Sequence, residues 1–116
     1  MMFPLTFTID GPPVGKERAR RGKGGHWYTP QKTADYQAKV AMTFLRTFRQ
    51  KLDPPANSLS LVYYSATKRC ADSDNILKIF GDALIGLAWK DDRGIGMSAV
   101  YGGIDRERPR VEVTLR

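Results

Sequence analysis

Residues 58–89 constrain the fold most strongly, because one hydrophobic pattern gives way to another within this segment. Apolar and polar side chains alternate over residues 58–64, and this period of two predicts a half-buried β-strand. Apolar side chains then recur every three or four residues from Ile76 to Leu87, which predicts an amphipathic helix with a broad buried face. A strand followed by such a helix indicates a sheet with helices packed on it.

A second long helix is predicted near the N-terminal third of the chain. Thr29 is suited to cap its start and Pro30 to occupy its first helical position, since proline needs no partner for an N–H there. An apolar stripe then continues to about Leu52, before the prolines at residues 54 and 55 end the helix. The stripe contains Tyr36, Val40, Phe44 and Phe48.

Alternation of apolar and polar residues predicts three more strands. They cover residues 5–9, residues 95–101 before the glycine pair at 102 and 103, and residues 111–116. We therefore expect an α/β (α+β) fold, with a small mixed sheet of about four strands and two main helices packed on it. The length of 116 residues fits a single domain, which we expect to span residues 1–116.

Composition narrows the chemistry that the chain can perform. Lys and Arg outnumber Asp and Glu by 19 to 12, and this excess of positive charge favours a polyanionic partner such as nucleic acid. One cysteine excludes an internal disulfide and a thiolate metal cluster. One histidine argues against a Ser-His-Asp or Cys-His catalytic site. No segment approaches the roughly 20 apolar residues of a membrane helix, so we expect a cytoplasmic protein without a membrane partner.

Residues 14–25 interleave basic side chains with glycines and lack hydrophobic periodicity, which indicates a mobile loop. Arginine binds phosphate oxygens in pairs and glycine lets a backbone approach closely, so we favour a clamp on a nucleic-acid backbone over a merely solvated loop. Trp27 and Tyr28 follow, and either stack on bases or pin the loop to the core; we expect the core. The predicted DNA-binding residues are Lys16, Arg18, Arg20, Arg21, Lys23, Lys68 and Arg69.

Acidic residues gather in two short segments, residues 72–74 and 91–92, in this otherwise basic chain. Crowded carboxylates repel one another unless a cation lies between them, and their hard oxygens suit Mg²⁺ or Mn²⁺. A helix from Asp74 to Trp89 would be about 22 Å long and would hold the segments apart. For them to meet, either the helix stops early near Gly86 or the following loop folds back. The simpler alternative is that Asp72, Ser73 or Asp74 only caps the helix.

Three ordered motifs identify a family resemblance. Residues 72–78 read Asp-Ser-Asp-Asn-Ile-Leu-Lys, residues 82–84 read Asp-Ala-Leu, and residues 89–92 read Trp-Lys-Asp-Asp. This series resembles the RusA family of Holliday junction resolvases, the crossover junction endodeoxyribonucleases of phages and prophages. Weaker similarity extends to the Gly-Pro-Pro turn at residues 11–13, the basic run at 16–20 and the final strand.

The resemblance implies a RusA-like fold and a Mg²⁺-dependent hydrolase, with Mn²⁺ as a substitute metal. Such an enzyme acts as a homodimer on branched DNA and nicks two strands symmetrically across a four-way junction, in recombination or repair in a bacterial cell. The family's metal-binding catalytic aspartates correspond to Asp72, Asp74 and Asp92, and its essential lysine corresponds to Lys78. Asp91 would share the role of Asp92 or substitute for it. A basic module that binds junctions without cutting them is the alternative.

Overall fold

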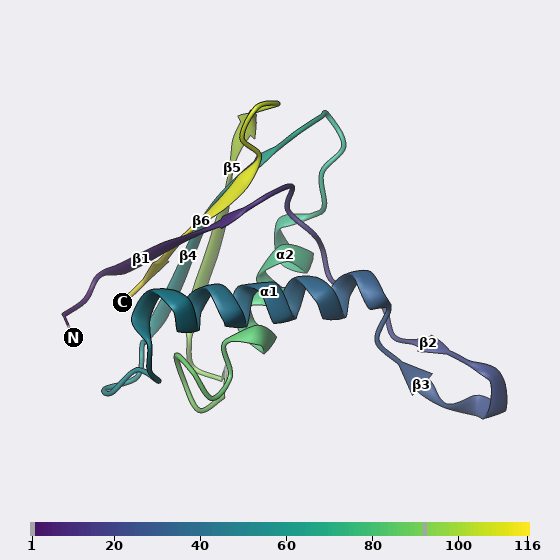
Figure 1. The fold of residues 1–116 in the computed structure, drawn as a ribbon, viewed down its shortest axis with the longest axis horizontal. Coiled ribbons are helices and arrows are strands. Elements are labelled where there is room, and N and C mark those ends of the chain that lie inside the picture. Colours follow the sequence, from purple (N-terminus) through teal and green to yellow (C-terminus); the bar gives the residue numbers. More distant parts are fainter. Residues whose placement is uncertain (1, 92) are drawn as a thin grey trace.

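A four-stranded mixed sheet and two helices make up the body of the protein, seen here in a computed structural model that describes residues 2–91 and 93–116. The strand order is β1-β6-β4-β5, with β4 and β5 parallel and the other neighbouring pairs antiparallel. Figure 1 shows both helices beside this sheet and a small hairpin that extends away from it. The elements are β1 (Leu5–Asp10), β2 (Arg20–Arg21), the 3₁₀ turn η1 (Lys23–Gly25), β3 (Trp27–Tyr28), α1 (Gln31–Phe48), β4 (Ser58–Ser65), α2 (Ser73–Ala83), β5 (Gly96–Ile104) and β6 (Arg110–Leu115).

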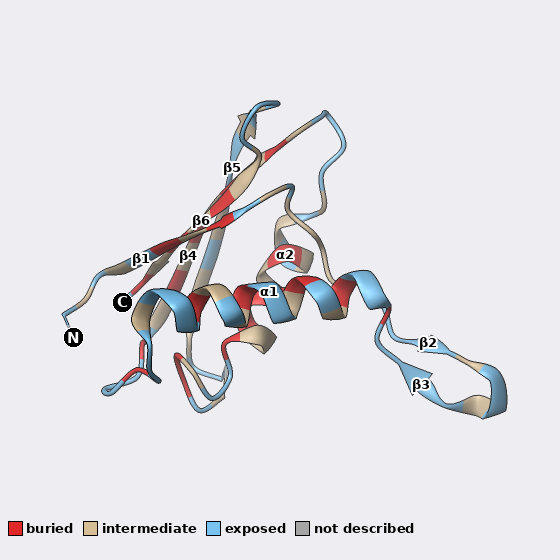
Figure 2. Cartoon of the chain, viewed as in Figure 1, coloured by how far each residue is buried: buried red, intermediate tan, exposed pale blue. Residues whose placement is uncertain are grey.

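The predicted class, a small mixed sheet with two main helices, is confirmed, and the alternating segments explain why. Every second residue of β4 and β6 is buried, so one face of the sheet packs on the helices and the other is more accessible (Figure 2). Helix α1 packs against β1, helix α2 packs against β5, and the two helices contact each other. Edge-to-face contacts of Phe7 with Phe44 and of Tyr36 with Phe80 join these layers in one core.

Both helices are shorter than predicted. Helix α1 begins after Pro30, which takes the N-cap position predicted for Thr29, and it ends at Phe48 because Arg49 adopts a left-handed conformation with φ 66°. Leu52, the predicted end, is buried outside the helix and donates its N–H to the carbonyl of Leu87 at 2.8 Å. No helix among the described residues is both long and apolar enough to cross a membrane.

Strand β5, at one edge of the sheet, is longer than predicted, because the glycines at 102 and 103 lie within it and do not end it. A register shift occurs opposite them, between Tyr63 and Tyr64 of β4. The ring of Tyr64 lies against Gly102, where a Cβ atom would come within 2.5 Å of the ring. Glycine at this position therefore permits the close approach of the two strands.

Candidate functional site

The first acidic pair lies where β4 leads into α2. Asp72 occupies the N-cap position and Asp74 the first turn, and both side chains are exposed, as is Lys78 one turn later. The hydroxyl groups of Tyr63 and Ser73 lie 2.6 Å apart, which ties the start of the helix to the strand. Neither Ser73 nor Asp74 is the N-cap residue, and the side chain of Asp72 makes no capping hydrogen bond. The carboxylates of Asp72 and Asp74 therefore lie in solvent at a helix start that is tied to the sheet.

Helix α2 stops early, at Ala83, three residues before Gly86. An early stop is one of the two arrangements predicted to let the acidic segments approach each other. Gly86 has φ +83°, and its N–H donates to the carbonyl of Trp89 at 2.7 Å, which turns the chain back. Trp89 is 3% exposed, and its indole N–H donates to the carbonyl of Gly81 at 3.4 Å. The buried indole therefore holds the chain that leads to the second acidic segment against the helix.

Asp91, in that second segment, interacts with Arg93. Its carboxylate accepts a hydrogen bond from the Arg93 backbone N–H at 2.9 Å and one from the guanidinium at 3.3 Å, and these bonds hold the pKa of Asp91 below its usual range. Asp92 lies outside the described residues, so its convergence with Asp72 and Asp74 stays a prediction. Within residues 2–91 and 93–116, no three His, Cys, Asp or Glu side chains are grouped to hold a metal ion.

The first part of the basic segment docks on α2, and the predicted mobile loop is wrong for this part. Lys16 donates its backbone N–H to the carbonyl of Asn75 at 2.9 Å, and its ammonium lies 2.5 Å from the carboxylate of Asp82. Gly15 fits so closely that a Cβ atom there would come within 2.7 Å of the Cβ of Ala71. Two segments about 60 residues apart in sequence are therefore locked together beside the acidic pair.

An open groove of ≈ 760 Å³ lies between the segment around Lys16 and the chain that leads into α2. One wall carries Asp72 together with Lys68 and Arg69, and the other carries Lys16 and residues near it. Three of the predicted DNA-binding residues therefore line the same groove as a predicted metal ligand. Lys32, from the first turn of α1, also lines the groove; it was not among the predicted residues because charged side chains on the polar face of a long helix usually only contact solvent.

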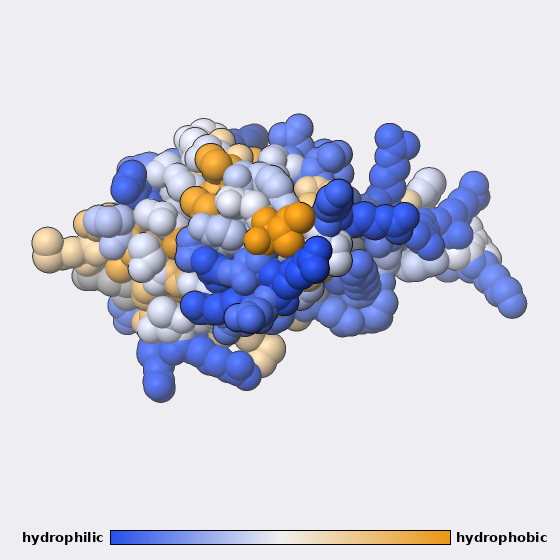
Figure 3. All heavy atoms as spheres, turned by 90° about the horizontal axis from the view of Figure 1, so that it is seen from above, coloured by the Kyte–Doolittle hydropathy of each residue, from blue (hydrophilic) through white to orange (hydrophobic). Residues whose placement is uncertain are grey.

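The second part of the basic segment forms a hairpin. Strands β2 and β3 pair so that Arg20 lies opposite Tyr28 and Arg21 opposite Trp27. Trp27 is 69% exposed and Tyr28 50% exposed, so the predicted packing of this pair in the core is wrong. The hairpin extends beyond the start of α1 and away from the sheet, so the core does not lie beside these two rings (Figure 1). Hydrophilic side chains predominate at this end of the molecule (Figure 3).

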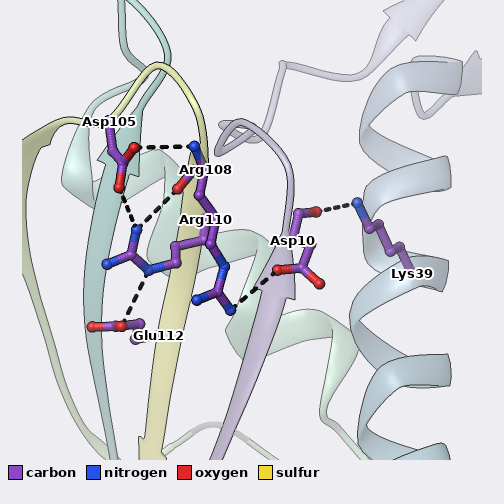
Figure 4. A network of polar contacts seen from close by, with 6 residues as sticks. All are labelled: Asp10, Lys39, Asp105, Arg108, Arg110 and Glu112. Atoms are coloured by element: carbon purple, nitrogen blue, oxygen red, sulfur yellow. Dashed lines mark hydrogen bonds and ion pairs between the residues drawn. The ribbon is translucent and has the colours of Figure 1, made fainter.

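A polar network fixes the end of β1, from which the basic segment departs (Figure 4). Lys39 of α1 donates a hydrogen bond to the carbonyl of Asp10, and the Arg108 guanidinium lies 3.7 Å from the Asp10 carboxylate. Arg110 lies 2.8 Å from Asp105, and their hydrogen bond raises the pKa of the guanidinium. The Arg110 guanidinium also stacks on the Tyr64 ring, 3.9 Å from its centre. The start of the basic segment is therefore anchored to the sheet and to α1.

Comparison with known proteins adds one finding to this geometry. The sequence model of a protein family described as Endodeoxyribonuclease RusA matches residues 10–116, which is nearly the whole chain. The match includes β1's last residue, the hairpin, both helices and all three motifs that contain the acidic residues. A comparison with curated protein sequences found no significant match.

Proposed function

The chain belongs to the RusA family of endodeoxyribonucleases, and from this membership we propose that it is a Mg²⁺-dependent enzyme that resolves four-way DNA junctions. The observation that carries the proposal is the groove beside α2, where Asp72 lies with Lys68 and Arg69, while Lys16 on the other wall is paired with Asp82. Positive side chains at this groove suit a phosphate backbone, and an exposed carboxylate pair at its edge suits a divalent cation. A cation site beside a basic groove is the combination that phosphodiester hydrolysis requires.

The proposed metal ligands are Asp72, Asp74 and Asp92, with Mn²⁺ as a substitute for Mg²⁺. Carboxylate oxygens are the donors that these hard cations prefer, and Asp72 and Asp74 are both exposed at the start of α2. When bound, the metal supplies an activated water and neutralises charge on the phosphodiester. Asp91 is engaged by Arg93, which favours Asp92 over Asp91 as the third ligand.

Lys78 would act on the phosphate that is cut. It lies one helical turn after Asp74 and is exposed on the same helix, with a compact charge at the end of a flexible chain. We propose that its ammonium stabilises the negative charge that develops on the phosphate oxygens as the bond breaks. The predicted DNA-binding residues would position the DNA backbone in the groove and along the hairpin.

We further propose that the enzyme is a homodimer, since two symmetric nicks in a two-fold junction call for paired active sites. Strand β5 offers a surface for a second copy because it lies at the edge of the sheet, contains no charged residue, and exposes Val100 and Ile104. Light scattering should give twice the 13.0 kDa mass of one chain, and V100K should shift this mass toward that of the monomer. A wild-type mass of one chain would contradict the dimer.

Cleavage of a synthetic four-way junction tests the proposed activity. The protein should nick the junction at symmetric positions in Mg²⁺ or Mn²⁺, and should leave it intact when a chelator removes the metal. A linear duplex with the sequence of one pair of arms is the matched control and should be cut far more slowly. Salt-sensitive binding of the junction without cutting in either metal would favour the non-catalytic binding module instead.

A further inference from the structure

We propose that Trp27, the more exposed of two adjacent aromatic residues on the β2–β3 hairpin, stacks on a nucleobase that is unstacked at the branch point of the DNA. The hairpin would then help the protein to distinguish branched DNA from a continuous duplex. The inference rests on the proposed function for its DNA partner, but it concerns binding and requires no cleavage.

Exposure of both rings is the first observation behind the inference. Large aromatic side chains that remain in water lose the free energy of burial, and here two adjacent ones are 69% and 50% exposed. Because they are neighbours in a strand, their side chains project from opposite faces of the hairpin. The Tyr28 ring lies against Gly22, where a Cβ atom would be 3.3 Å away. Each face of the hairpin therefore presents one aromatic ring.

Backbone hydrogen bonds fix the turn beside which these rings project. Gly22 donates its N–H to the carbonyl of His26 at 2.8 Å, and Gly25 donates to the carbonyl of Gly22 at 3.2 Å. Gly24 and Gly25 have φ +82° and +81°, which other residues adopt only with strain, so glycine makes this tight turn possible. A ring on a hydrogen-bonded turn loses less conformational entropy when it stacks than a ring on a mobile loop, because the backbone is already ordered.

The charges around the rings select the partner. The register places Arg20 opposite Tyr28 and Arg21 opposite Trp27, and Lys23 lies at the turn. Basic side chains that follow a phosphate backbone, combined with rings on which bases stack, are the features of proteins that bind single-stranded nucleic acid. A continuous duplex keeps its bases stacked inside the helix, whereas a branch point exposes base faces at lower cost. An unstacked base in branched DNA therefore fits this hairpin better than a regular duplex does.

Binding measured without a divalent metal tests the inference separately from cleavage. A junction with 2-aminopurine at the branch should lose fluorescence when the wild-type protein stacks on that base. W27A should weaken junction binding by roughly 10- to 100-fold and abolish this fluorescence change, while W27F should retain most of both. Affinity for a linear duplex should change less than about twofold, because phosphate contacts dominate it. M42A, which removes an exposed side chain from α1, is the matched control.

Several results would overturn the inference, and they can be told apart from results that would overturn only the proposed nuclease activity. Unchanged junction affinity in W27A, or equal losses for junction and duplex, would show that no base is stacked there. A shift of W27A toward a smaller mass in light scattering would assign the rings to an interface between copies. Wild-type protein that binds no DNA would overturn both proposals. Wild-type protein that binds the junction with the fluorescence change but never cuts it would overturn only the nuclease activity.

Discussion

Replacement of Asp74 by asparagine is expected to reduce metal-dependent junction cleavage by at least about 100-fold, while junction binding is retained. Asparagine keeps the size of the side chain but removes the negative charge that attracts a divalent cation. Binding should be equal or tighter, because a negative charge beside the groove repels the DNA backbone. The rate of nicking under single-turnover conditions and the dissociation constant without metal measure these two effects separately.

The same substitution distinguishes a catalytic aspartate from one that only stabilises the helix. Asp74 lies in the first turn of α2 and is exposed, so loss of its favourable interaction with the helix dipole should cost no more than about 1 kcal/mol in the free energy of unfolding. D53N, at an exposed site between α1 and β4, is the matched control and should cleave like the wild type. Undiminished cleavage by D74N would contradict the proposed metal site.

The strands and the buried faces of the helices could be predicted because their patterns are local. Alternation located β4 and β6 to within one residue, and the spacing of Tyr36, Val40 and Phe44 identified the buried face of α1. The helix ends could not be located in this way. Arg49 ends α1 in a left-handed conformation that is rare for a residue other than glycine. Helix α2 ends at Ala83, and the turn after it is held by contacts of Trp89, which a periodic pattern does not reveal.

In the candidate site, too, local features could be predicted from the sequence and contacts between distant residues could not. Asp72 and Asp74 lie at the start of α2 and Lys78 lies one turn after Asp74, so their placement on one element could be predicted from spacing. The docking of Lys16 on Asn75 and Asp82 could not, because it joins residues about 60 apart through a backbone hydrogen bond and an ion pair. The exposure of Trp27 differs from the prediction because the hairpin has no core beside it, so the usual preference of aromatic residues for the interior is not met there.

Truncation of Trp89 to alanine is expected to lower the free energy of unfolding by about 3–5 kcal/mol, which is a large fraction of the stability of a domain this size. The indole is buried, and its removal would leave a cavity beside α2 and take away the N–H group that donates to the Gly81 carbonyl. Urea unfolding followed by circular dichroism measures the change, because this method does not depend on tryptophan fluorescence.

The chain offers a matched control in its second tryptophan. W27A removes the same side chain from an exposed hairpin, so it should change the free energy of unfolding by less than about 0.5 kcal/mol. W89F should lie between the two, since it keeps most of the buried ring but loses the hydrogen bond to Gly81. If W89A proved as stable as W27A, Trp89 would not hold the turn after α2. The second acidic segment would then need another anchor to reach Asp72 and Asp74.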